Sequence, residues 1–147
     1  MFYLPTAEEF IQEFSETART TVDTMISNAD KYGINPDDPW SEESLTALAT
    51  KFLADTSKIT TDEVTMFIGE GRVRIKGDRW SLLPESGKPL SSEYATSALR
   101  IIFHACVIRQ DNKSGNMPLG WIRLMRDYNE PTALATFVLD PDPSDEE

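Results

Sequence analysis

The chain has 147 residues, 39% of them apolar, which is typical of one globular domain with a hydrophobic core. Its formal net charge of −11 argues against general affinity for nucleic acid or an anionic membrane, and favours a basic partner. A single cysteine excludes an internal disulfide, and no apolar run reaches the roughly 20 residues of a membrane helix. The N-terminus lacks the basic segment of a secretory signal, so a cytoplasmic location is expected.

The first predicted element is a long amphipathic helix that starts at Thr6 and is closed by Gly33. Thr6 and Glu9 have the spacing of a capping box. Apolar residues recur every three or four positions from Phe10 to Tyr32, and acidic residues occupy the opposite face. A helix of this length is expected to span the whole domain.

A proline-rich turn leads to a second predicted helix, which begins at Ser41. Two acidic pairs surround this start, Asp37 with Asp38 before it and Glu42 with Glu43 in its first turn. They lack a histidine and the ordered spacing of a calcium-binding loop. We therefore interpret them as a solvated loop and helix start, and predict no metal site.

The central stretch of the chain fits a helix followed by a strand. Thr60 and Glu63 have capping-box spacing, and Gly77 suits a helix end. One face of this helix would bury an apolar stripe that ends at Ile75. The strand would begin at Arg79.

The same stretch also fits a hairpin, in which residues 72–76 pair with residues 79–83. A resemblance favours the helix and strand. Residues 67–70, Phe-Ile-Gly-Glu, and residues 77–80, Gly-Asp-Arg-Trp, resemble a pattern of small, largely uncharacterised bacterial domains: aromatic-x-Gly-Glu, then Gly-Gly-x-Trp. The resemblance implies that the first part is helical and that the tryptophan starts a strand. Here Asp78 stands in place of the second glycine.

Residues 94–108 are apolar on nearly every side, which predicts a helix in the middle of the core. The second half of this segment, residues 101–108, also suits a buried strand. It contains the only histidine and the only cysteine, His104 and Cys106, which we interpret as a hydrogen-bonded core histidine and a structural cysteine. An enzyme would need Glu70, His104 or Cys106 to converge on a pocket that shifts the pKa of the group. His104 and Cys106 alone cannot form a zinc site.

Near the C-terminus, Pro118 suits the first turn of a helix that continues to Tyr128. Residues 133–139 suit a last edge strand, and residues 140–147 form an acidic, proline-broken tail that we predict to be disordered. Together these elements predict an α+β fold: a helix-rich single domain over residues 1–139 with a small antiparallel sheet.

Charge is distributed unevenly along the chain. The net formal charge is −9 over residues 1–63, +5 over residues 64–126 and −7 over residues 127–147. A basic middle beside Trp80 could hold phosphates and stack a base, as single-strand binders do, although the overall negative charge opposes this. The candidate anion-binding residues are Arg72, Arg74, Lys76 and Arg79.

The hypothesis we favour is a small acidic module that binds a protein, most plausibly a basic one. A bacterial immunity-type inhibitor of a basic toxin suits the size, the acidity and the lack of a catalytic signature. Acidic side chains would accelerate encounter with a cationic partner. The candidate partner-binding residues are Glu13, Glu16, Asp23, Asp37, Asp38, Glu42 and Glu43. A nucleic-acid-associated protein and an enzyme with an unrecognised site remain alternatives. The sequence implies no cofactor and leaves the oligomeric state open.

Overall fold

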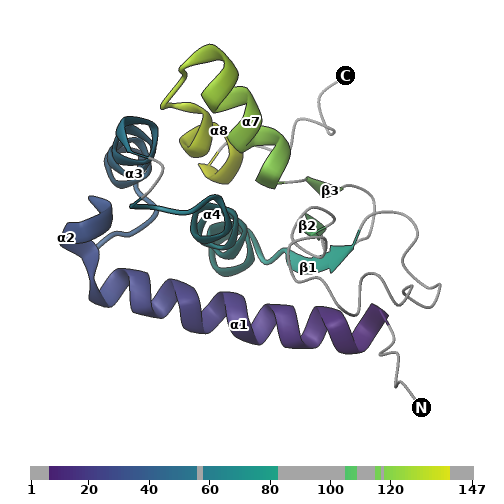
Figure 1. Cartoon of the computed structure of the whole chain (residues 1–147). Helices are drawn as coiled ribbons and strands as arrows, with labels where there is room; N and C mark the ends of the chain where they lie inside the picture. The colour runs from purple at the N-terminus through teal and green to yellow at the C-terminus, as the bar shows by residue number, and fades with distance from the viewer. Residues whose placement is uncertain (1–6, 56–57, 83–104, 109–114, 117, 140–147) are drawn as a thin grey trace.

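The computed structural model describes residues 7–55, 58–82, 105–108, 115–116 and 118–139, and these residues are mainly helical (Figure 1). The helices, numbered as in Figure 1, are α1 (Ala7–Ser27), α2 (Ala29–Tyr32), α3 (Glu42–Ala54), α4 (Thr61–Lys76), α7 (Pro118–Tyr128) and α8 (Ala133–Leu139).

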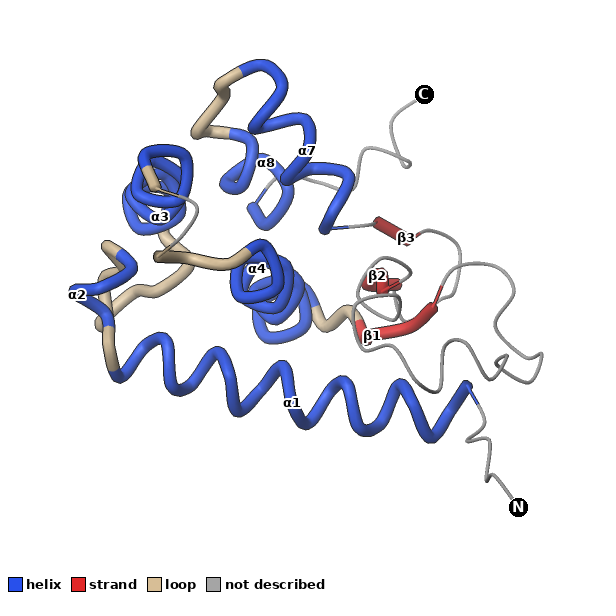
Figure 2. Tube along the Cα trace, viewed as in Figure 1, coloured by secondary structure: helices blue, strands red, loops and turns tan. Residues whose placement is uncertain are grey.

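Helix α4 lies at the centre of the described structure. It packs against α1 on one side and against α7 and α8 on the other, while α3 packs against α8 (Figures 1 and 2). The core fills the space between these helices, as their periodic apolar faces require. The largest side chains that are fully buried there are Phe52, Phe67, Met25, Leu45, Leu48, Ile59, Ile68, Ile122, Met125 and Leu134.

In the described ranges, the strands are β1 (Arg79–Leu82), β2 (Ala105–Ile108) and β3 (Gly115–Asn116). They pair antiparallel in the order β1-β2-β3, with Trp80 opposite Val107. Their described lengths are four, four and two residues, and Trp80 of β1 joins the core that the helices build. The α+β class predicted from the sequence is therefore wrong: the described part of the chain is helix-rich, and helices packed on helices build its core.

The central stretch is a helix followed by a strand, and the hairpin alternative is excluded because residues 72–76 are helical. Thr60 and Glu63 form the predicted capping box: the Glu63 N–H donates to Thr60 Oγ1 at 3.1 Å, and the Thr60 N–H donates to Glu63 Oε1 at 2.9 Å. Gly77 ends the helix at φ 75°, a left-handed conformation that favours glycine. One detail is wrong, since Ile75 is 49% exposed and lies off the buried face.

The long first helix is interrupted, whereas the sequence predicted a continuous helix to Gly33. Asn28 leaves helical geometry, at φ −112° and ψ 41°, and separates α1 from α2. Its side-chain amide donates to the Thr24 carbonyl at 3.0 Å. A short polar side chain that takes a helical carbonyl as its acceptor competes with the backbone hydrogen bonds of the helix. Gly33 does close α2 as predicted, at φ 74°. Thr6 lies outside the described residues.

The C-terminal segment 133–139 is helix α8, and the prediction of an edge strand there is wrong. The run Ala-Leu-Ala-Thr-Phe-Val-Leu has too little polar content to separate a period of 2 from one of 3.6. Packing against α3, α4 and α7 buries most of the helix surface and decides for the helix. The predicted helix from Pro118 to Tyr128 is confirmed as α7.

Among the described residues, no helix combines the length and the apolarity needed to cross a membrane. The predicted tail, residues 140–147, and His104 lie outside the described residues. Ala105–Ile108 is extended, as one of the two alternatives for that segment predicted.

Candidate functional site

Two glycines of α4 lie directly beneath two tryptophans. A Cβ atom on Gly69 would lie 2.0 Å from Cη2 of Trp80, and one on Gly71 would lie 2.6 Å from Cδ1 of Trp40. Residues two apart on a helix point about 200° apart. The two indoles therefore hold α4 from nearly opposite sides, and only glycine permits this approach.

A buried carboxylate joins these tryptophans. Glu70 is 4% exposed. Its Oε1 accepts a hydrogen bond from Trp80 Nε1 at 3.0 Å, and its Oε2 accepts one from Arg74 Nε at 2.9 Å. The Arg74 guanidinium also stacks over Trp40, 5.2 Å from the ring centroid. We call Trp80, Glu70, Arg74 and Trp40 the α4 polar chain.

The remaining contacts of both indoles tie the α4 polar chain to other elements. Trp40 Nε1 donates to the carbonyl of Phe67 at 2.9 Å and stacks on the Phe67 ring at 5.1 Å. Trp80 meets Phe14 of α1 edge-on, with ring centroids 4.8 Å apart. Arg74 Nη2 reaches Asp23 of α1 at 3.1 Å. The α4 polar chain thus connects α1, α4, β1 and the α2–α3 connection.

A fully buried ion pair joins Arg72 of α4 to Asp78, which follows the helix end. Arg72 Nε donates to Asp78 Oδ2 at 2.7 Å, and both side chains are 3% exposed. Arg72 Nη1 also donates to the Phe137 carbonyl of α8 at 2.9 Å, and the guanidinium lies 5.8 Å from the Phe137 ring centroid. A buried charge is tolerated only when it is paired and hydrogen-bonded. This pair therefore binds the end of α4 to α8.

The predicted anion-binding residues have individual structural roles. Arg72 is buried against Asp78, and Arg74 is held by two carboxylates. Lys76 Nζ donates to the Leu139 carbonyl at 3.1 Å. Arg79 is exposed and has contacts of its own. Sequence periodicity could not reveal that Arg72 points inward, because arginine is usually a surface residue.

The acidic candidates are all exposed and fall into two groups. Glu13, Glu16 and Asp23 lie on α1, and the other group occupies the α2–α3 connection and the first turn of α3. Of the seven, Asp23 alone has an ion pair within the described part of the chain. The other six, which we call the acidic surface, are Glu13, Glu16, Asp37, Asp38, Glu42 and Glu43.

The three groups proposed for an enzyme are not seen to share a site. Both carboxylate oxygens of Glu70 are engaged in the α4 polar chain. His104 lies outside the described residues, and the side chain of Cys106 is not described. Within the described ranges, no cluster of three or more His, Cys, Asp or Glu side chains could hold a metal ion.

Tyr32 and Glu63 form a contact that sequence reasoning missed. The Tyr32 hydroxyl donates to Glu63 Oε2 across 31 positions of sequence. Burial, this hydrogen bond and the nearby negative charge raise the pKa of Tyr32 to about 12. Burial alone would raise the pKa of Glu63, but hydrogen bonds from Tyr32 and Thr60 and the charge of Lys31 lower it. No local pattern could have indicated this pair.

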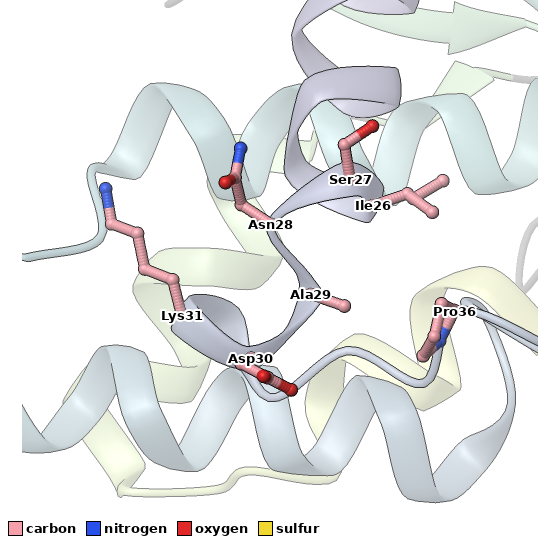
Figure 3. A pocket seen from close by; sticks show the side chains of 7 residues that line it. All are labelled: Ile26, Ser27, Asn28, Ala29, Asp30, Lys31 and Pro36. Carbon is pink, nitrogen blue, oxygen red and sulfur yellow. The ribbon is translucent and has the colours of Figure 1, made fainter.

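A hollow opens at the break between α1 and α2, with a volume of about 400 Å³ (Figure 3). The Ala29 side chain points towards Pro36, those of Ile26 and Asp30 extend to the same side of the view, and Lys31 points away from it (Figure 3). The hollow is also lined by Ser27 and Asn28. We call this hollow the notch. It exists because α1 is interrupted, which the sequence did not predict.

Comparison of the chain with protein-family models, curated proteins and solved structures finds no match. The functional argument therefore rests on the chemistry of this chain. The residues that carry the resemblance stated above, Gly69, Glu70, Gly77 and Trp80, all act in holding α4 to β1. Their spacing has a structural explanation that needs no ligand.

Proposed function

We propose that the protein is a binding module for a basic protein. A cytoplasmic immunity-type inhibitor of a basic bacterial toxin is the form of this function that we would test first. The proposal rests on one observation: Arg72 and Arg74 of the middle segment pair with carboxylates of the same chain, while the acidic surface keeps its charge exposed.

The pairing of charges supports this asymmetry. Arg72 is neutralised by Asp78, from the same segment, and Arg74 by Glu70 and Asp23. Among the described residues, Asp23 is the one candidate acid of the seven that forms an ion pair. The negative field of the remaining acids extends into solvent, where it would raise the rate of encounter with a cationic partner.

The outward face of α1 is suited to a flat protein contact. Besides Glu13, Glu16 and Asp23, the exposed residues of α1 are hydroxyl residues together with one amide and one cation: Thr17, Thr20, Thr24, Ser27, Gln12 and Arg19. Thr24 Oγ1 bonds back to the Thr20 carbonyl at 3.0 Å, so its polar group is already satisfied and costs little to cover. Short side chains also lose little conformational entropy on binding. Binding of nucleic acid is less favoured, because Arg72 and Arg74 already form ion pairs with Asp78 and Glu70.

The test begins with affinity capture from a lysate of the source organism at low salt, and identification of the dominant bound protein. Association of that protein is then measured with a variant that carries Glu13→Gln, Glu16→Gln, Asp37→Asn, Glu42→Gln and Glu43→Gln. Because steering depends on these charges, we expect the association rate at low salt to fall about tenfold or more. The dissociation rate should change less, since exposed acids act mainly on encounter.

A variant with the same charge change provides the control. It carries Asp140→Asn, Asp142→Asn, Asp145→Asn, Glu146→Gln and Glu147→Gln, so its net charge equals that of the first variant. The proposal predicts that this control associates nearly as fast as the unmodified protein. Equal slowing in both variants would mean that net charge alone sets the association rate and that the acidic surface has no special role. No slowing in either variant would contradict the proposal.

A further inference from the structure

The notch is a preformed feature. The Asn28 backbone N–H donates to the carbonyls of Thr24 and Met25, at 3.0 and 3.1 Å, which fixes the end of α1. Beyond the break, the Ile34 N–H donates to the Ala29 carbonyl at 3.1 Å. Both walls are therefore held by backbone hydrogen bonds, and a ligand would pay little to order them.

Two lysines, Lys51 and Lys31, contact residues around the notch. Lys51 Nζ, from α3, donates to the Asp30 carbonyl at 2.8 Å. Lys31 Nζ lies 5.1 Å from the ring centroid of Tyr32, and its charge acts on Glu63. The charge of Lys31 is thus directed away from the notch, in agreement with its orientation in Figure 3.

The lining combines an apolar floor with a carboxylate. Ile26, Ala29 and Pro36 supply carbon surface, and the Asp30 side chain points towards the same side (Figure 3). Asp30 is exposed and forms no side-chain ion pair in the part of the chain that the structure describes. Asp37 directly follows Pro36 and is also exposed. The exposed carboxylates of Asp30 and Asp37 are the negative charges beside the notch, while Lys51 is bonded to the Asp30 carbonyl and Lys31 points away.

We propose that the notch receives a lysine or arginine side chain of the basic partner. The methylene stem of such a side chain would cover Ile26, Ala29 and Pro36, while its charged head would meet Asp30. An uncharged apolar side chain would leave the carboxylate without a partner, and an acidic one would be repelled by it. This inference rests on the proposed function and assigns one anchoring contact to it.

The test is a titration of isotopically labelled protein, followed by backbone amide NMR, with N-acetyl-arginine methylamide as the probe. We expect saturable shifts confined to the amides of residues 26–31 and their neighbours. N-acetyl-norleucine methylamide has a similar stem without the charge and should bind more weakly. Asp30→Asn should weaken binding of the arginine probe about two- to fivefold, the range of a single exposed ion pair.

Asp127→Asn is the matched control, because it removes an exposed charge of the same kind from α7, outside the notch lining. It should leave the affinity for the probe unchanged. Equal binding of the two probes, or shifts spread over many acidic sites, would overturn the notch as a cation site. So would a lack of shifts at residues 26–31.

The two proposals fail separately. If the arginine probe does not bind at the notch but the five-acid variant still slows association with the captured protein, the notch is wrong and the acidic surface stands. If the probe binds at the notch while association is insensitive to the five acids, the notch stands as a cation site and the proposed function fails.

Discussion

The α4 polar chain and the acidic surface use the same kinds of side chain for opposite purposes. In the α4 polar chain the carboxylate of Glu70 is buried and has two donors. On the acidic surface, six carboxylates are exposed and have no ion pair within the described residues. Buried charges must be satisfied inside the fold, whereas exposed charges contribute little to stability and are left for a partner.

This difference can be tested by ranking the effects of substitutions on the free energy of unfolding. Changes in and beside the α4 polar chain should be severe, and changes on the acidic surface should be small. Global stability is typically about 5–15 kcal/mol, so the two regions are expected to separate clearly.

The largest effect is expected for Asp78→Ala, which leaves the guanidinium of Arg72 buried without its partner. Loss of one member of a buried ion pair costs about 3–5 kcal/mol. Denaturant unfolding followed by circular dichroism measures this loss. Replacing both members, by Arg72→Met and Asp78→Leu, should recover much of it, because no charge is then left unpaired. A loss below about 1 kcal/mol for Asp78→Ala would show that the pair is not the stabilising contact we infer.

The second largest effect is expected for Gly69→Ala, which should lower the free energy of unfolding by about 3 kcal/mol. Its Cβ would lie 2.0 Å from Trp80, whose ring is also held by Glu70, so either the indole or α4 must move. Gly120→Ala in α7 is the control, since a Cβ there meets nothing within 4 Å. That substitution should stabilise the protein by about 0.5–1 kcal/mol. Equal melting temperatures for the two variants would contradict the close contact.

Tyr32→Phe should cost about 1 kcal/mol, the usual net value of one hydrogen bond. Because the pKa of Tyr32 is raised from 10.0 to about 12, its contribution is complete below pH 10 and is lost as the pH rises towards 12. The pKa of Glu63 is lowered, so its contribution is present above 4.5 and is lost as the pH falls below that value.

Unfolding measured across both pH ranges checks this prediction. The Tyr32→Phe variant should lose stability less steeply than the unmodified protein at both extremes of pH. Tyr128→Phe is the matched control, because Tyr128 is 71% exposed. Tyr128→Phe should leave the loss of stability at high and at low pH unchanged. If Tyr32→Phe has the same pH profile as the unmodified protein, the hydrogen bond between Tyr32 and Glu63 is excluded as the cause of these losses.

The smallest effect on stability is expected for the five-acid variant of the acidic surface. Its total change should stay below about 1 kcal/mol, because Glu42 and Glu43 gain only modestly from the start of α3 and mutual repulsion is relieved. Thermal unfolding measures this change. A loss comparable to that of Asp78→Ala would mean that the acidic surface has a structural role, and the contrast between the two regions would disappear.

Local rules of the sequence predicted much of the helical structure. Ser41 and Thr60 both accept hydrogen bonds as helix N-caps, and Gly33 and Gly77 both end helices in left-handed conformations. Each of these features depends on a few neighbouring residues. They could therefore be recognised without knowledge of the rest of the chain.

The errors occurred where local signals were ambiguous. Residues 133–139 suit a strand or a helix, and contacts with three other helices decided the outcome. Asn28 interrupts a periodic pattern that alone predicts an unbroken helix. The acidic candidates could be identified as surface residues, but the notch beside them exists only because of that interruption.

The sequence by itself determined the starts of α3 and α4, the helix ends at Gly33 and Gly77, the order of α4 and β1, and the excess of acidic charge. Tertiary structure alone decided that Arg72 points inward, that Trp80 rests on Gly69, and that Tyr32 meets Glu63. Caps and turns involve residues a few positions apart, so the local sequence is enough to decide their geometry. Burial of a charge or an indole depends on what distant segments place around it, and only the packed chain settles that.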